Sequence, residues 1–364
     1  MTRPFFYNII FLTLFLVSCA SPSYVYSIQR VPNTVYHQPV QNQTTQAFNQ
    51  AVAAPISQTG YLANPNVQAF MRYQNQVHGL DTQYLNNFFA QAAYRGNIID
   101  IMNRPSTSRP WYEFHKNNAN ATKIAAGKKF YQTHQAVIDA AAARYGVPPE
   151  VIVAIIGIET HYGSNTGSIR VADSLATLAF DYPRRAAFFQ KELSEFLKLA
   201  QEEKRSPFEF MGSYAGAMGL PQFMPSSFRQ WAVDFDLDGR RDIWRSVPDT
   251  AASIAHYLKQ HGWQTGGRMV IPVSMPLTPQ LLSIVEQKTA LTYTVGQLRQ
   301  MGVMPQQTVS DQERAVLYRL EIAPKQFAYF IGLNNFYSVW HYNNSRMYVT
   351  AVRDIANGIR NSHL

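Results

Sequence analysis

Residues 151–158 form an apolar run without a single polar side chain. Pro148 and Pro149, just before it, suit the start of a helix, and Glu150 suits the positive first turn. Gly163 suits the helix end. A helix that is apolar on every side has no face for water, so we expect it to lie inside a core. The pattern therefore predicts a buried central helix between Pro149 and Gly163.

Glu159 follows directly where this apolar run ends. Burial and the negative end of the helix dipole both favour the neutral form of such a carboxyl group. A glutamic acid that stays protonated near neutral pH is suited to general acid catalysis. The alternative is a last-turn glutamate that faces water, which is the commoner situation at helix ends.

Helical spacing of apolar residues continues through most of the chain. It starts between residues 64 and 145, and the residues that carry it include Val67, Phe70, Met71, Leu85, Phe88 and Phe89. Further helices are expected over residues 171–180, 186–202, 251–261, 295–301 and 335–358. The strand-like segments are RMVIPVSMP from residue 268, AVLYRLEI from residue 315 and QFAYFIG from residue 326. The predicted fold class is α+β, mainly α.

The N-terminus has the pattern of an export signal. Arg3 precedes an apolar run over residues 5–17, which is short for a membrane span. The run ends in LVSC, which resembles a bacterial lipobox, and Cys19 is the only cysteine, so no disulfide forms within the chain. We expect a signal peptide over residues 1–18 and a stable lipid anchor if Cys19 carries two or more acyl chains. The alternative is an ordinary cleaved signal with an incidental cysteine.

Residues 20–60 are rich in Gln, Asn, Thr, Ser, Pro and Val, and Arg30 is their only charged residue. Such a segment buries little apolar surface, so we expect a flexible tether. The whole chain has 364 residues, with 32 Lys and Arg against 23 Asp and Glu, which gives a formal net charge of +9. This excess favours an anionic surface or polymer as partner. No nucleic-acid-binding motif is present, so nucleic acid is not expected.

Residues 212–228 read GSYAGAMGLPQFMPSSF and form the most distinctive loop. Three glycines and two prolines prevent a regular helix and permit close approach of the backbone to a ligand. Ser213 and Gln222 offer small polar groups that could orient sugar hydroxyl and acetamido groups. The alternative is a tight turn between two helices.

The order of these motifs resembles the membrane-bound lytic murein transglycosylase B family. The resemblance rests on GIETHYG, ADSLATLAFDYPRRAAFF, GSYAGAMGLPQFMPSSF and AVDFDLDG, and extends from about residue 61 to the C-terminus. It implies a lysozyme-like core that cleaves peptidoglycan glycan strands, flanked by a helical domain and a small β-containing domain. It also implies an outer membrane lipoprotein that faces the periplasm, with complexes with other cell-wall enzymes as possible further partners.

The resemblance also suggests domain boundaries. After the signal peptide and a tether over residues 19–60, we expect a helical domain over residues 61–140 that residues 335–364 complete. The lysozyme-like catalytic core then occupies residues 141–264, and the small β-containing domain occupies residues 265–334.

The segment from Asp234 matches the first half of an EF-hand loop. Side-chain oxygens stand at positions one, three and five, glycine at six and an aspartate at nine, which suits Ca²⁺. Position twelve is Arg245 instead of glutamate, and the resemblance implies that a later aspartate closes the loop. The expected ligands of a structural Ca²⁺ are Asp234, Asp236, Asp238, Arg240 at the backbone-carbonyl position and Asp249, with Asp242 at position nine. The alternative is an acidic turn without metal, and no organic cofactor is expected.

Near the C-terminus the segment WHYNNSRMY carries further candidate residues. The resemblance implies that Tyr342, Asn343 and Tyr348 line the cleft. Tyr257, on the helix expected over residues 251–261, is a further candidate for substrate binding. By themselves, such aromatic residues more often belong to the core.

The chemistry depends on whether Glu159 has a carboxylate partner. Asp173 and Asp181 are the candidates, and either would make the protein a hydrolase of muramidase type. The resemblance favours a lytic transglycosylase, in which Glu159 alone is acid and then base and the product ends in 1,6-anhydromuramic acid. A third possibility is a lipoprotein that binds the cell wall without catalysis.

Overall fold

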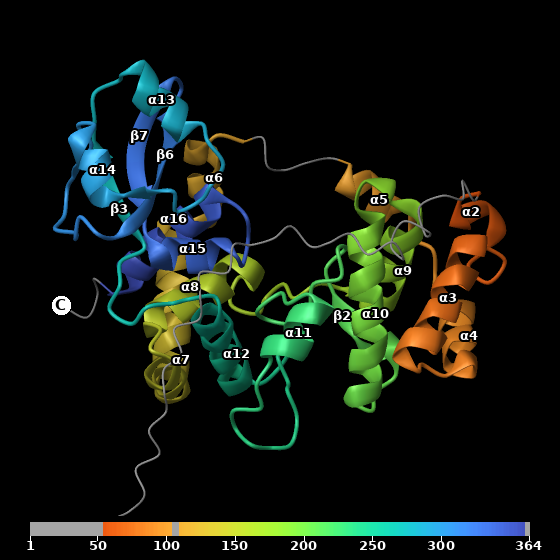
Figure 1. Ribbon diagram of the computed structural model, residues 1–364. Helices are drawn as coiled ribbons and strands as arrows, with labels where there is room; N and C mark the ends of the chain where they lie inside the picture. The colour runs from red at the N-terminus through yellow and green to blue at the C-terminus, as the bar shows by residue number, and fades with distance from the viewer. Residues whose placement is uncertain (1–53, 104–108, 361–364) are drawn as a thin grey trace, which may run out of the picture. The chain divides into compact units, whose positions relative to one another are not determined.

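The computed structural model describes residues 54–103 and 109–360 (Figure 1). Its helices are α2 (Ile56–Thr59), α3 (Pro65–His78), α4 (Thr82–Gln91), α5 (Gly96–Met102), α6 (Trp111–Asn118), α7 (Ala121–Tyr145), α8 (Pro149–Thr160), α9 (Val171–Asp181), α10 (Ala186–Glu202), α11 (Pro225–Trp231), α12 (Val247–Gln260), α13 (Pro279–Val285), α14 (Val295–Gln300), α15 (Asn334–Trp340) and α16 (Arg346–Arg360). Short 3-10 turns flank α10, namely η3 (Pro183–Arg185) and η4 (Pro207–Glu209). The signal peptide, Cys19 and the tether up to residue 53 lie outside the described residues.

The strands are β1 (Ile169–Arg170), β2 (Met211–Gly212), β3 (Val270–Ser274), β4 (Tyr293–Thr294), β5 (Met304–Pro305), β6 (Arg314–Ala323) and β7 (Gln326–Gly332). β1 and β2 form a small antiparallel pair. The other strands form one antiparallel sheet in the order β4-β6-β7-β3-β5. The three predicted strands are therefore confirmed as β3, β6 and β7.

Helix α8 is the centre of the main core. Each residue from 151 to 156 is at most 1% exposed, and α7, α12 and α16 pack around the helix. No side of α8 contacts water over this stretch, so a polar side chain on any side would be buried. This explains why residues 151–156 are all apolar. The predicted buried helix is confirmed.

The predicted helical domain over residues 61–140 has two sets of neighbours. Its first part packs on α9 and α10, where Tyr84 donates a hydrogen bond to the carbonyl of Leu197 and Phe70 meets Phe180 edge-on. Its second part, α6 and α7, packs on α8, α12, α16 and β6 instead. The C-terminal segment returns to the same place, because α16 contacts α6, α7 and α8.

The folded part begins before residue 61. Residues 56–59 form α2, Ile56 is 2% exposed, and its backbone N–H donates to Asp181 at 3.1 Å. Tyr61 is also buried, with its hydroxyl 3.3 Å from that of Thr177. The tether prediction is therefore wrong for its last residues, because these apolar side chains are buried against α9.

The C-terminal helix predicted over residues 335–358 is two helices. α15 ends at Trp340 and α16 begins at Arg346, and the intervening break carries Tyr342. Within residues 54–103 and 109–360, no single helix has the length and hydrophobicity to cross a bilayer. The helical segment 111–145 and α8, which are joined by a sharp bend, meet these two criteria only when they are taken together.

Candidate active site

Glu159 lies in the last turn of α8, where the apolar helix reaches the surface. The side chain is partly buried, and its Oε1 accepts a hydrogen bond of 2.7 Å from the hydroxyl of Tyr348. Burial raises the pKa of Glu159 to about 7, although the Tyr348 hydrogen bond and the positive charge of Lys123 both act to lower it. Both protonation states are therefore accessible near neutral pH.

Lys123 supplies the positive charge near Glu159, and sequence reasoning missed it. It lies in the first turn of α7 and is 5% exposed, and its ammonium group has no hydrogen-bond partner among the described residues. Burial lowers the pKa of Lys123, and the charge of Glu159 raises it. One buried face of α7 carries Lys123, Gly127 and Tyr131, which are spaced four residues apart. The position of a lysine on this face was the sequence feature that could have revealed it.

Tyr162 fixes the end of α8 against α7. His161 and Tyr162 adopt left-handed backbone conformations, with φ of 52° and 59°, which end the helix directly after Thr160. The ring of Tyr162 covers Gly157, where an added Cβ would lie 2.6 Å from the ring or closer, and its hydroxyl donates to the carbonyl of Lys123 at 2.8 Å. One side chain thus links the turn that carries Glu159 to the turn that carries Lys123.

An aromatic cluster lies beside Glu159. The rings of Tyr342 and Tyr348 are nearly parallel with centroids 6.3 Å apart, and Tyr257 meets Tyr342 edge-on at 4.9 Å. Tyr342 donates to the carbonyl of Pro221 at 2.6 Å, and Tyr257 donates to that of His341 at 2.8 Å. Tyr257 is only 7% exposed, so it supports Tyr342 from behind more than it offers a surface to a ligand.

The loop over residues 212–224 is held by its own hydrogen bonds. The hydroxyl of Ser213 accepts from the backbone N–H groups of Ala215 and Ala217, at 3.3 and 3.1 Å. The amide nitrogen of Gln222 donates to the carbonyls of Gly219 and Thr166. The amide oxygen of Gln222 has no such partner within the described chain, so it remains available to a ligand.

Asn343, the remaining predicted cleft residue, is exposed in the break between α15 and α16. Its backbone carbonyl accepts a hydrogen bond from Ser345, and no contact of its side chain is described. Its place next to Tyr342 keeps it near the aromatic cluster.

Asp173 and Asp181 have structural roles in this fold. Asp173 is fully buried and receives hydrogen bonds from Arg95, Arg170 and the backbone of Ala93. Asp181 accepts the backbone N–H of Ile56. Both carboxylates attach N-terminal residues to α9, and no carboxylate among the described residues bonds to Glu159.

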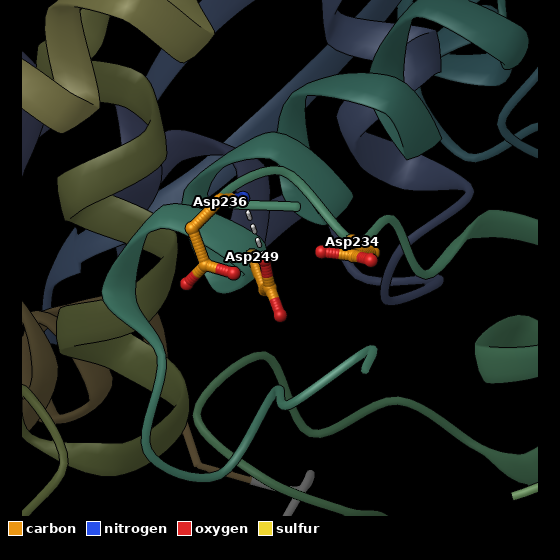
Figure 2. Close-up of side chains that lie close together, drawn as sticks. All are labelled: Asp234, Asp236 and Asp249. Atoms are coloured by element: carbon orange, nitrogen blue, oxygen red, sulfur yellow. Dashed lines mark hydrogen bonds between the residues drawn. The ribbon is translucent and has the colours of Figure 1, made fainter. Parts of the chain in front are cut away.

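The acidic loop brings three of its aspartates together. Asp234, Asp236 and Asp249 each offer a carboxylate oxygen within 4.8 Å of the others, and Figure 2 shows them turned toward a common region. Asp249, in the first turn of α12, is buried and accepts the backbone N–H groups of Phe235 and Asp242 at 2.7 and 2.8 Å. Asp234 Oδ1 is buried without a hydrogen-bond partner in the described structure, which leaves an acceptor free for a hard cation.

The other predicted ligands are not part of this group. Asp238 is exposed and accepts the backbone N–H of Arg240, while Arg240 itself lies exposed in the loop. Asp242 accepts the N–H groups of Trp244 and Arg245. Asp249, four residues beyond position twelve, is the later aspartate that lies close to Asp234 and Asp236.

A family model described as "Transglycosylase SLT domain" matches residues 62–357 of this chain. The chain belongs to this family. Among its SLT-family relatives, the membrane-bound lytic murein transglycosylase B of Escherichia coli strain K12 is 37% identical over 306 residues, which cover 81% of this chain and 83% of the relative.

Solved structures of the SLT family support the same assignment. The soluble lytic transglycosylase SltB1 of Pseudomonas aeruginosa is 41% identical, with a TM-score of 0.77 over 82% of this chain and 99% of that one. The Escherichia coli lytic transglycosylase Slt35, solved in complex with calcium, is 35% identical, with a TM-score of 0.74 over 83% of this chain and 95% of that one. The predicted fold, mainly helical with a lysozyme-like core and a small sheet, is confirmed.

Proposed function

We propose that this SLT-family chain is a lytic transglycosylase that cleaves the β-1,4 bond between N-acetylmuramic acid and N-acetylglucosamine in peptidoglycan. Glu159 is the acid and then the base of this reaction. The observation that carries the proposal is the state of this carboxyl group, whose pKa burial raises to about 7. Its hydrogen-bond partner in the described structure is the Tyr348 hydroxyl and not a second carboxylate.

In the first step Glu159 donates its proton to the glycosidic oxygen. The bond between this oxygen and C1 of the muramic acid breaks, and the leaving N-acetylglucosamine keeps the proton on its new 4-hydroxyl group. The acetamido oxygen of the same muramic acid stabilises the cationic C1, so no protein nucleophile is required. The absence of a bonded carboxylate partner for Glu159 is consistent with this step.

In the second step the ionised Glu159 removes the proton from the muramic acid 6-hydroxyl. The 6-oxygen bonds to C1 and closes the 1,6-anhydro ring, and Glu159 returns to its protonated form without consuming water. A pKa near the working pH suits a group that must both donate and accept a proton. Tyr348 and Lys123 stabilise the carboxylate between the two steps.

The surroundings of Glu159 are suited to holding a glycan. Tyr342 is partly buried and offers its ring to a sugar face, while Tyr348 is 2% exposed and supports it with a ring inclined by only 10°. Gln222 and Ser213 belong to the adjoining loop, and Asn343 follows Tyr342. We assign these residues to substrate orientation, with Tyr257 as their support.

The acidic loop binds Ca²⁺ in this proposal. Asp234, Asp236 and Asp249 supply carboxylate oxygens, and Asp238 and the Arg240 carbonyl are the further ligands that the EF-hand spacing suggests. The ion would neutralise the three clustered carboxylates and join the loop to α12. Its role is structural, and the chemistry at Glu159 does not involve it.

The chain reaches its substrate from the membrane. Acylation of Cys19 would make it an outer membrane lipoprotein that faces the periplasm, where peptidoglycan lies. The Escherichia coli relative is named membrane-bound, which is compatible with this location.

Mass analysis of digested peptidoglycan tests the function. A lytic transglycosylase leaves muramic acid ends that are lighter by one water than the reducing ends from a hydrolase. Reducing ends would establish the muramidase alternative, and undigested strands would leave a cell-wall-binding protein without catalysis.

A further inference from the structure

A cleft of about 820 Å³ adjoins the substrate loop, residues 212–224. It lies between the C-terminal end of α10, strand β2 and the segment that follows the acidic loop. Trp244 contributes to its wall and is held in place by a 3.0 Å hydrogen bond from its indole nitrogen to the carbonyl of Met211. Of its lining residues, Arg240 alone has a role assigned above, and that role uses its backbone carbonyl and not its side chain.

Basic side chains outnumber acidic ones in the cleft lining. The basic residues are Lys204, Arg205, Arg240, Arg241 and Arg245, and the acidic residues are Glu203, Glu209 and Asp242. Two of the basic residues are already paired, because Arg205 contacts Glu209 and Arg241 contacts Glu203. Oδ1 of Asp242 accepts the backbone N–H groups of Trp244 and Arg245.

Three cations of the cleft therefore remain available. Lys204, Arg240 and Arg245 are exposed, and none of them has an ion pair within the described ranges. They face a concave surface, where cations on several sides attract one anion together. A carboxylate is a suitable ligand, since the planar guanidinium group of arginine binds it through two parallel hydrogen bonds.

The cleft is next to the start of the substrate loop, because Met211 directly precedes the loop and lines the cleft. Thr166 lines it, and the carbonyl of the same residue accepts the amide of Gln222 at 3.2 Å. A glycan held by Gln222 would thus have its substituents beside the cleft. Muramic acid carries a short peptide that contains free carboxylates, and an extended peptide covers about 3.3–3.6 Å per residue.

We propose that this cleft binds the carboxylates of the peptides that branch from muramic acid. The proposal rests on the function proposed above and adds a second determinant of substrate choice. Strands that carry peptides would bind both through their sugars at the aromatic cluster and through their carboxylates at Lys204, Arg240 and Arg245. Strands without peptides would use the first contact alone.

The test compares two substrates, one with peptides and one without. The first is purified peptidoglycan, and the second is the same material after an amidase has hydrolysed the bond between the lactyl group and the peptide, which leaves one lactyl carboxylate on each muramic acid. The full-length double variant Lys204→Gln with Arg245→Gln removes two cations and spares Arg240, whose backbone lies in the acidic loop. We expect KM to rise at least about threefold on peptide-bearing strands, with kcat and the KM for bare strands unchanged.

The matched control is Lys129→Gln with Lys288→Gln, which removes the same charge from residues that do not line the cleft. An equal rise of KM in this control, or an equal rise on both substrates in the cleft variant, would overturn the proposal. An unchanged KM of the cleft variant on peptide-bearing strands would also overturn it. If the cleft variant lost only its binding to anionic phospholipid vesicles, the cleft would be assigned to a membrane surface and the proposal would be wrong.

The wild-type protein gives an independent measurement. Added salt screens exposed charges, so it should raise KM more for peptide-bearing than for bare strands, and equal salt effects on the two substrates would contradict the proposal. The reaction products distinguish this proposal from the proposed function. If the products have anhydro ends but the cleft variant has the same KM change on both substrates, the transglycosylase function stands and only the peptide site is ruled out.

Discussion

The hydroxyl group of Tyr348 donates a 2.7 Å hydrogen bond to Oε1 of Glu159 across 189 residues of sequence. Tyr348 is 2% exposed, so α16 presents a fixed donor to the end of α8. This bond favours the carboxylate, whereas burial favours the neutral acid. Burial at the end of α8 and the hydrogen bond from Tyr348 on α16 therefore shift the pKa of Glu159 in opposite directions.

Tyr348→Phe should raise the pKa of Glu159, because it removes a hydrogen bond that stabilises the ionised form. Cleavage requires the protonated acid, so activity falls as pH rises through this pKa, and the alkaline limb of the pH profile should move upward by about one unit. The control is Tyr342→Phe, whose hydroxyl donates to Pro221. A limb that stays in place in Tyr348→Phe, or that moves equally in both variants, would contradict this role.

Lys123→Met should also move the alkaline limb to higher pH, because the positive charge of Lys123 lowers the pKa of Glu159. The same variant should raise the melting temperature, since it removes a buried ammonium group that lacks a hydrogen-bond partner in the described structure. The control is Lys129→Met on the exposed side of α7. A shift to lower pH would show that Lys123 acts on another group.

Calcium should stabilise the fold through the acidic loop. Chelation is expected to lower the melting temperature, because an ion that binds only the native state stabilises it. Asp234→Asn should abolish the difference between calcium and chelator, while Asp100→Asn, at an exposed residue far along the chain, should retain it. Identical melting curves of the wild type in calcium and chelator would remove the metal from the account.

Cys19→Ala should release the protein from the membrane, because the chain contains no other cysteine for acylation. The released form should keep its activity on isolated peptidoglycan, since the residues proposed for catalysis and substrate binding all lie far from Cys19 in the sequence. Fractionation of cells that express the variant measures this directly. A variant that still sediments with the membranes would argue against the lipid anchor.

Local pattern was sufficient for the elements whose sequence and environment agree. The apolar run of α8 favours a buried helix, and the β-branched and aromatic residues of β3, β6 and β7 favour strands. Glu159 stands out because it ends the apolar run. Lys123 was missed because its burial becomes apparent only once α7 packs on α8, which is a tertiary arrangement. The same limit applies to Tyr257, whose spacing does not reveal that Tyr342 covers it.

In the acidic loop, the EF-hand motif predicts the first ligands but not the last one. The first residues follow the EF-hand spacing, so Asp234 and Asp236 were found by position. Asp249 could be placed only through the family resemblance, because the fold of the intervening residues decides which aspartate returns to the loop. The start of the folded region near Ile56 was missed for a related reason. The short segment around Ile56 is mostly polar, so its sequence does not indicate that Ile56 is buried against α9.

The measurement that tests the central claim most directly is digestion of peptidoglycan in heavy-oxygen water, followed by mass analysis of the new muramic acid ends. The wild type should give 1,6-anhydro ends without the label, because the 6-hydroxyl of the sugar closes the ring and water takes no part. Glu159→Gln keeps the shape of the side chain but transfers no proton, so the yield of ends should fall by at least about a hundredfold. Label incorporated into the new muramic acid ends of the wild type would show that water is the acceptor and would contradict the account.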